Sequence, residues 1–138
     1  MTLGLTPSQT VGPFFSIGLS RRAQNELPGG TLRLAGRVLD GEGAAVADAV
    51  VELWEPRAGF ARCGTDASGD FSFVLPEEPR RYEVMVFARG LLKPVLTRLY
   101  LPGATGAEDD SMVAREDGDG LRFDVRLQGD GETAFFEL

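Results

Sequence analysis

YEVMVFARGLLKPVLTRLYLP, residues 82–102, contains two apolar segments on either side of Gly90. In the first segment, apolar side chains occupy consecutive positions, as in a strand that is packed on both faces. The second segment, 95–100, is rich in the β-branched and aromatic residues that strands favour. We therefore expect the two segments to form the central strand pair of a β-sheet, against which the other apolar runs pack.

The rest of the chain contains short apolar runs separated by turn residues at regular intervals, with no convincing long helix. This pattern predicts an all-β fold, an antiparallel β-sandwich of about seven to eight strands over residues 32–138. Besides the central pair, strands are expected at 32–39, 49–54, 60–64, 71–75, 121–127 and 133–138, and a short helix around 109–114. No internal repeat interrupts the pattern.

Residues 1–31 are expected to form an irregular N-terminal arm. Prolines and glycines recur too often there for a long helix or a central strand. However, the segment also contains Val11, Phe14, Phe15, Ile17 and Leu19, which are too apolar for a solvated tail. An arm that packs either on its own sheet or on a partner explains both features.

The composition excludes several classes of protein. At 138 residues the chain has the size of one domain, and its single cysteine, Cys63, favours a reducing compartment because it has no internal disulfide partner. The N-terminus has no basic and apolar signal sequence, and no apolar run approaches the roughly 18 residues of a membrane span. A net charge of −7 with scattered basic residues argues against nucleic acid as a partner. We expect a cytoplasmic protein that binds neither membranes nor nucleic acid.

Histidine is absent from the chain, which excludes a Ser-His-Asp triad and a histidine metal ligand or general base. Cys63 lies in an expected strand and is interpreted as a structural thiol. The acidic run 108–110 lacks the ligand spacing of a calcium loop and is interpreted as a solvated loop. Arg89 follows an apolar strand, where its guanidinium could hold a carboxylate with two hydrogen bonds. An ordinary surface arginine paired with a nearby acid is the alternative.

Five segments in the same order resemble the intradiol ring-cleavage dioxygenases, and specifically the α-type subunits of that family. They are TPSQTVGPFFSIGL (6–19), LRLAGRVLDGEGAAVADAVVELWEP (32–56), RCGTDASGDFSF (62–73), VFARGLLKPVLTRLYLP (86–102) and LRFDVRLQGDGETAFFEL (121–138). The first and last segments are the most specific. The hairpin within 32–56 also resembles transthyretin-like and carboxypeptidase-regulatory-like sandwiches, so a binding or structural module without enzymatic activity is the alternative.

The resemblance implies an iron-free (non-catalytic) alpha subunit of a heteromeric enzyme. In that family the partner β subunit holds Fe(III) through two tyrosines and two histidines, and the histidine positions correspond here to Arg81 and Glu83. The implied complex, a higher-order hetero-oligomer, cleaves protocatechuate (3,4-dihydroxybenzoate) with O2 to 3-carboxy-cis,cis-muconate. This chain itself would bind no cofactor and would be inactive in isolation.

The resemblance also implies which residues of this chain line the substrate pocket. Thr10, Gly12 and Pro13 belong to an arm that reaches the cleft beside the partner's iron, and Arg89 corresponds to the arginine that helps to bind the substrate carboxylate. The connections after Trp54, Phe73 and Leu101 are shorter than is usual in the family, which affects the expected extent of the subunit interface.

Overall fold

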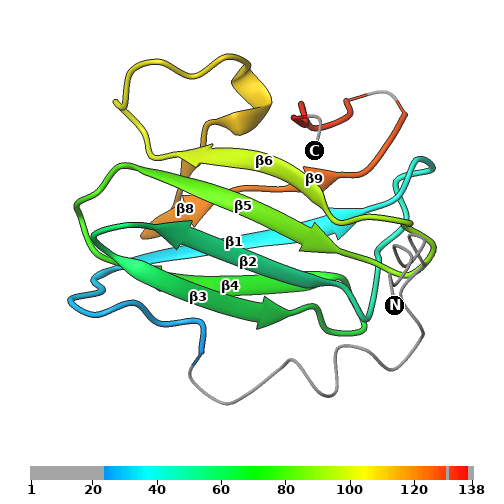
Figure 1. Cartoon of the computed structure of the whole chain (residues 1–138), viewed down its shortest axis with the longest axis horizontal. Coiled ribbons are helices and arrows are strands. Elements are labelled where there is room, and N and C mark those ends of the chain that lie inside the picture. Colours follow the sequence, from blue (N-terminus) through cyan, green and yellow to red (C-terminus); the bar gives the residue numbers. More distant parts are fainter. Residues whose placement is uncertain (1–23, 130, 137–138) are drawn as a thin grey trace, which may run out of the picture.

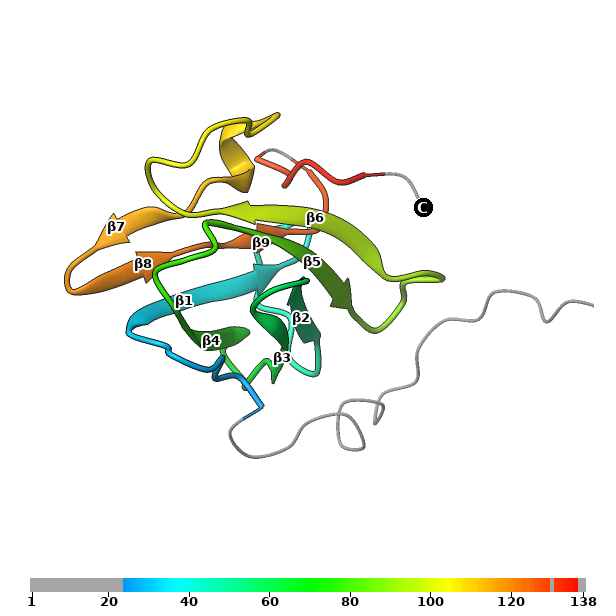
Figure 2. The same ribbon diagram turned by 60° about the vertical axis from the view of Figure 1, so that its left-hand side comes forward.

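The strands form two β-sheets packed face to face in a computed structural model that describes residues 24–129 and 131–136 (Figure 1). The expected all-β sandwich is thus confirmed, with nine short strands and one 3-10 helix in the described part of the chain. No helix in that part is long and apolar enough to span a membrane. Figure 2 shows the two layers from another side, with the β7–β8 hairpin projecting from the sandwich.

The first sheet is entirely antiparallel and has the order β3-β2-β5-β6. Its strands are β2 (Val50–Glu55), β3 (Gly59–Gly64), β5 (Arg81–Phe87) and β6 (Val95–Tyr100). The expected pairing of the two segments around Gly90 is confirmed, because β5 pairs with β6 from Arg81 opposite Tyr100 to Val86 opposite Val95. β2 lies on the other side of β5, with Leu53 opposite Val84, so β5 is a central strand of this sheet.

The second sheet has the order β4-β1-β8-β7, and β9 also pairs with β1. Its strands are β1 (Leu32–Leu39), β4 (Asp70–Leu75), β7 (Arg115–Asp117), β8 (Gly120–Arg122) and β9 (Val125–Arg126). β1 is antiparallel to β4 but parallel to β8 and β9. The second sheet is therefore mixed.

The expected single strand 121–127 is wrong in detail, because it is divided into β8 and β9. Phe123 and Asp124 lie between the two strands, but both still form hydrogen bonds to the backbone of β1. The Phe123 N–H donates to the Ala35 carbonyl at 2.9 Å. The Asp124 Oδ1 accepts from the backbone N–H of Arg37 at 3.0 Å. A carboxylate thus replaces the backbone carbonyl that an uninterrupted strand would present.

The described residues 133–136 do not form a strand, although one was expected at 133–138. Among its described residues, Phe136 forms an isolated bridge with Leu96 of β6. The N–H of Ala134 donates to Ser111 Oγ at 2.9 Å, and its carbonyl accepts from Thr97 Oγ1 at 2.7 Å. Side chains therefore satisfy backbone groups that a strand would have paired. The short helix expected around 109–114 is a 3-10 turn, Asp110–Met112.

The core lies between the two sheets and is closed at one edge by the end of the expected arm. Leu27 is buried, and its N–H donates to the Val74 carbonyl of β4. The Gln24 carbonyl accepts from the N–H of Arg62 in β3. Residues 24–31 thus pack on the chain's own sheets, whereas residues 1–23 lie outside the described part. The fully buried side chains with the largest volumes are Tyr82, Tyr100, Phe73, Leu34, Leu53, Leu75, Leu99, Leu101 and Met112.

Tyr82 makes the stability of the fold depend on alkaline pH. Burial, and then the charges of Glu55 and Glu78, raise the pKa of its hydroxyl from 10 to about 12. The folded state therefore disfavours tyrosinate, and stability present below pH 10 should be lost as the pH rises towards 12, by up to about 3 kcal/mol. We expect Tyr82→Phe to remove this loss when unfolding free energy is measured by denaturant titration at both pH values.

Tyr100→Phe is the matched control because it removes the only other tyrosine of the chain. This variant should keep the alkaline loss that Tyr82 causes. An equal alkaline loss in wild type and in Tyr82→Phe would show that Tyr82 is not its source.

Candidate functional site

Arg89 lies two residues after the end of β5, at the end of the first sheet, where the chain turns at Gly90. Its backbone position is fixed because Ala88 before it is buried and accepts the N–H of Leu91. The Arg89 Nη2 donates to Asp48 Oδ2, and its side chain is 55 % exposed. The surface ion pair weighed as an alternative from the sequence is thus present. Among the residues that the structure describes, Asp48 is the one hydrogen-bond partner of the guanidinium, which has further N–H donors.

Three connections meet around Arg89 and enclose a depression of about 490 Å³. It is lined by Asp40, Ala45, Val46, Ala47, Arg89, Gly90, Leu91, Leu127 and Gln128. Asp40 is occupied in its own turn, where its Oδ1 accepts from the backbone N–H groups of Glu42 and Ala44 at 2.9 Å. Arg89 is therefore the cationic group that this depression offers to a ligand.

Thr10, Gly12 and Pro13, the other expected pocket residues, lie outside the described residues. The described end of the expected arm, at Gln24 and Asn25, contacts β3 and β4 through backbone hydrogen bonds. The predicted roles of these three residues stay predictions.

The residues of this chain do not fit a ferric site of the kind that uses tyrosine and histidine. The chain has no histidine, and its described residues contain no cluster of three or more Cys, Asp or Glu side chains suited to a metal ion. Tyr82 points into the core, and the Tyr100 hydroxyl donates to Glu108 at 3.0 Å. Burial raises the pKa of the Cys63 thiol, which agrees with a structural role.

Arg81 and Glu83 stand two residues apart on β5 and so lie on the same face of the sheet. Glu83 accepts from Arg98 Nε at 3.0 Å across the β5–β6 pair. Arg98 also donates to Glu108 at 2.7 Å and lies over the ring of Phe136, 4.6 Å from its centroid. An ion-pair network that ties β6 to the loop after it therefore occupies the strand position at which the resemblance placed a metal ligand.

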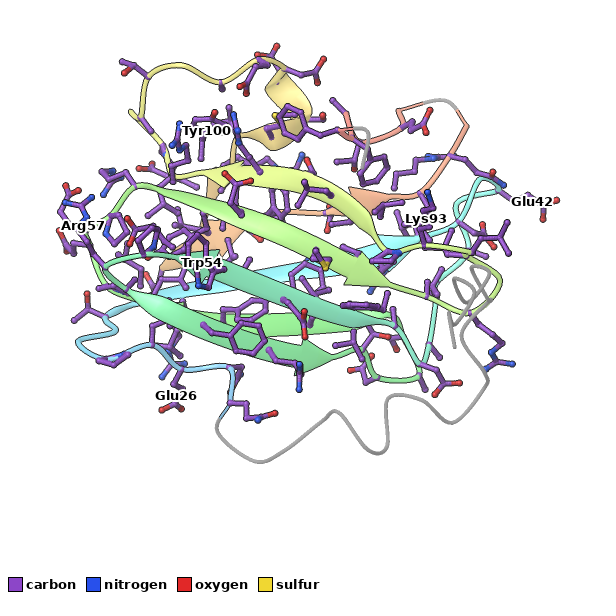
Figure 3. The ribbon with its side chains drawn as sticks, viewed as in Figure 1. Glu26, Glu42, Trp54, Arg57, Lys93 and Tyr100 are labelled. Atoms are coloured by element: carbon purple, nitrogen blue, oxygen red, sulfur yellow. The ribbon has the colours of Figure 1, made fainter. Side chains whose placement is uncertain are left out.

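A second depression, of about 650 Å³, lies beside Arg81 at the end of the sheet opposite Arg89. We call it the arginine pocket; it is lined by Trp54, Glu55, Pro56, Arg57, Pro79, Arg80, Arg81, Glu83, Gly103, Ala104 and Thr105. Figure 3 shows Trp54 and Arg57 towards this end, and Lys93 and Glu42 towards the other. Sequence reasoning missed the pocket because its walls come from three segments that are 20 and more residues apart. The first two of these segments are brought together by the β2–β5 register.

Comparisons with known proteins agree with this architecture. No family model matches the chain. It is 31% identical to the protocatechuate 3,4-dioxygenase alpha chain of Burkholderia cepacia, with 99% of both chains covered. It is 28% identical to the alpha chain of the same name from Pseudomonas putida, with 96% of both covered. The first alignment spans 195 positions against the 138 residues here, so the relative contains insertions that this chain lacks.

Solved structures share the fold at lower identity. One is the dioxygenase domain of a dioxygenase–carbohydrate-binding protein fusion from Streptomyces sp. SirexAA-E, with a TM-score of 0.59 and 22% identity, over 90% of this chain and 98% of that domain. Another is catechol 1,2-dioxygenase from Pseudomonas arvilla C-1, with a TM-score of 0.57 and 20% identity, over 78% of this chain and 57% of that one. The likeness concerns the sandwich itself.

Proposed function

Since the chain belongs to the intradiol dioxygenase family and is a full-length homologue of protocatechuate 3,4-dioxygenase alpha chains, we propose that it is the iron-free subunit of a two-chain enzyme. The observation that carries the proposal is an intact sandwich of this family in a chain without histidine. A partner β chain would hold Fe(III), which supplies the activation of a catechol-type substrate for reaction with O2. The substrate proposed is 3,4-dihydroxybenzoate, and the product is 3-carboxy-cis,cis-muconate.

The contribution of this chain would be recognition of the substrate. Within the described part of the chain, the Arg89 guanidinium bonds to Asp48 through Nη2 alone and keeps further N–H donors. A planar guanidinium matches a carboxylate with two parallel hydrogen bonds. We propose that the partner covers the depression at Arg89, so that the pair and an incoming carboxylate are removed from water together. Thr10, Gly12 and Pro13 of the arm would line the same substrate cleft.

The proposed enzyme would work in the cytoplasm as a hetero-oligomer. The single cysteine and the acidic net charge support a reducing compartment and argue against a nucleic-acid partner. The size of the oligomer and of the subunit interface would depend on the connections that are shorter here than in the alpha chains.

Co-expression with a histidine- and tyrosine-bearing β chain tests the proposal. We expect the two chains to co-purify and the complex to contain iron and to cleave 3,4-dihydroxybenzoate. The chain purified alone should contain no stoichiometric iron and should have no activity, because it lacks the ligands for a ferric centre.

Metal analysis and absorption spectra provide the decisive readings. A stoichiometric iron content of the chain alone, with an absorption band from tyrosinate bound to iron, would contradict the assignment. Full activity of the β chain without this one would also contradict it.

A further inference from the structure

The arginine pocket gathers positive charge on a protein whose net charge is −7. Three of its lining residues, Arg57, Arg80 and Arg81, are cations, against the two carboxylates Glu55 and Glu83. We propose that this pocket binds a small aromatic carboxylate, at a site separate from Arg89 and independent of iron. The site lies at the other end of the sheet and is built wholly from described residues of this chain.

Arg80 is held in position without being neutralised. Its Nη2 donates to the Pro102 carbonyl at 2.7 Å and its Nη1 to the Glu77 carbonyl at 3.1 Å. Carbonyl oxygens fix the direction of the guanidinium but leave its net charge available. The guanidinium of Arg81, exposed at the start of β5, has no hydrogen-bond or ion-pair partner among the residues that the structure describes. Two adjacent guanidinium groups thus offer donors to an anion.

Both carboxylates of the pocket are already engaged. Glu55 accepts from the backbone N–H groups of Arg57 and Ala58, at 2.7 and 2.8 Å. Burial alone would raise the pKa of Glu55, but these hydrogen bonds and the Arg57 charge lower it. Glu83 is paired with Arg98. Neither carboxylate bonds to Arg80 or Arg81, so a bound anion would not have to displace an ion pair of these two arginines.

The aromatic part of the proposed ligand follows from Trp54. Its side chain extends from the outer face of β2 and is 49 % exposed, although most large apolar side chains of the sandwich are buried. Pro56 and Pro79 supply further apolar surface to the same pocket. A flat ring can stack on the indole while its carboxylate reaches the guanidinium groups. The volume of about 650 Å³ lies within the range of roughly 300–1,000 Å³ typical of small-molecule sites.

The test uses a property of the chain itself, since Trp54 is its only tryptophan. Benzoate is titrated into the full chain without a partner, and the intrinsic fluorescence of Trp54 is followed. We expect a saturable change with benzoate, and a much weaker response to phenol, which lacks the carboxylate, and to acetate, which lacks the ring. An equal response to phenol, or no saturable response to benzoate, overturns the proposal.

Arg81→Gln supplies the charge test and Arg33→Gln its matched control. Arg33 is an exposed arginine on β1, in the other sheet and outside the pocket. Arg81→Gln should weaken benzoate binding by roughly threefold to tenfold, as the loss of a partly exposed charge-assisted hydrogen bond predicts. Equal weakening in both variants would indicate a general charge effect and overturn the assignment. Because neither the partner nor iron is used, this outcome is independent of the ring-cleavage proposal.

Discussion

Replacing Arg89 with alanine is expected to lower kcat/KM for 3,4-dihydroxybenzoate while leaving catechol nearly unaffected. This expectation rests on the proposed function, in which Arg89 holds the carboxylate that catechol lacks. Loss of a charge-assisted hydrogen bond to a buried carboxylate costs about 1.5–3 kcal/mol. The corresponding loss of kcat/KM is on the order of 10- to 150-fold. The measurement requires the assembled complex with its iron content checked, so that an assembly defect is not mistaken for lost recognition.

Two further variants separate recognition from local structure at Arg89. Arg89→Lys should recover part of the loss, because lysine keeps the charge but not the planar fork. Asp48→Asn removes the charge partner of Arg89 and keeps a residue that tolerates the left-handed backbone of position 48, where φ is 63°. It should change kcat/KM much less than Arg89→Ala. Equal losses for both substrates in Arg89→Ala would assign Arg89 a structural role instead.

The variant Gly36→Ala is expected to reduce the free energy of unfolding by about 3 kcal/mol or more, because the overlap it creates involves backbone as well as side chain. Gly36 lies in β1, and the backbone of Phe123, between β8 and β9, packs directly against it. A Cβ at this position would overlap the Phe123 carbonyl oxygen and would lie 2.5 Å from Cζ of Phe71. Neither group can move away without disturbing the β1 pairings.

Denaturant titration gives the free energy, and Gly41→Ala is the control. The three atoms nearest to a Cβ at Gly41 would all belong to the side chain of Gln128, which is at the surface and can change its rotamer. We expect Gly41→Ala to alter stability by less than about 1 kcal/mol. If the Gly36→Ala protein is as stable as the Gly41→Ala protein, the backbone at Phe123 can move away from position 36 at little cost.

The sequence predicted the first sheet well because two of its three strand pairs, β2–β3 and β5–β6, join strands that are consecutive in this sheet along the chain and antiparallel. The segments on either side of Gly90 pair as expected, and the boundaries of β2 and β3 were predicted to within one residue, as were those of β4 in the second sheet. The division of 121–127 was not predictable from periodicity, since Phe123 continues the apolar alternation. What divides the strand is the Asp124 carboxylate bonding to Arg37, 87 residues earlier in the chain.

The candidate sites were less predictable than the fold. The alternative that Arg89 pairs with a nearby acid was weighed from the sequence, but Asp48 could not be named without the position of the β1–β2 connection. The arginine pocket required the register that places Trp54 opposite Glu83. The sequence shows adjacent arginines at 80–81 next to a proline, but only the folded structure shows that they line a pocket together with residues of other segments.

The parallel pairing of β1 with β8 and β9 has a consequence for the synthesis of the protein. The strands of the first sheet lie within residues 50–100, so each of them is synthesised within about 50 residues of the strands that it pairs with. β1 is made before any of them, but its second neighbour ends only at Arg126 of a 138-residue chain. One edge of β1 therefore stays unpaired through most of translation, when an open edge can template pairing with other nascent chains. A chain released before residue 121 would lack the residues that pair with this edge of β1, and the edge would stay unpaired.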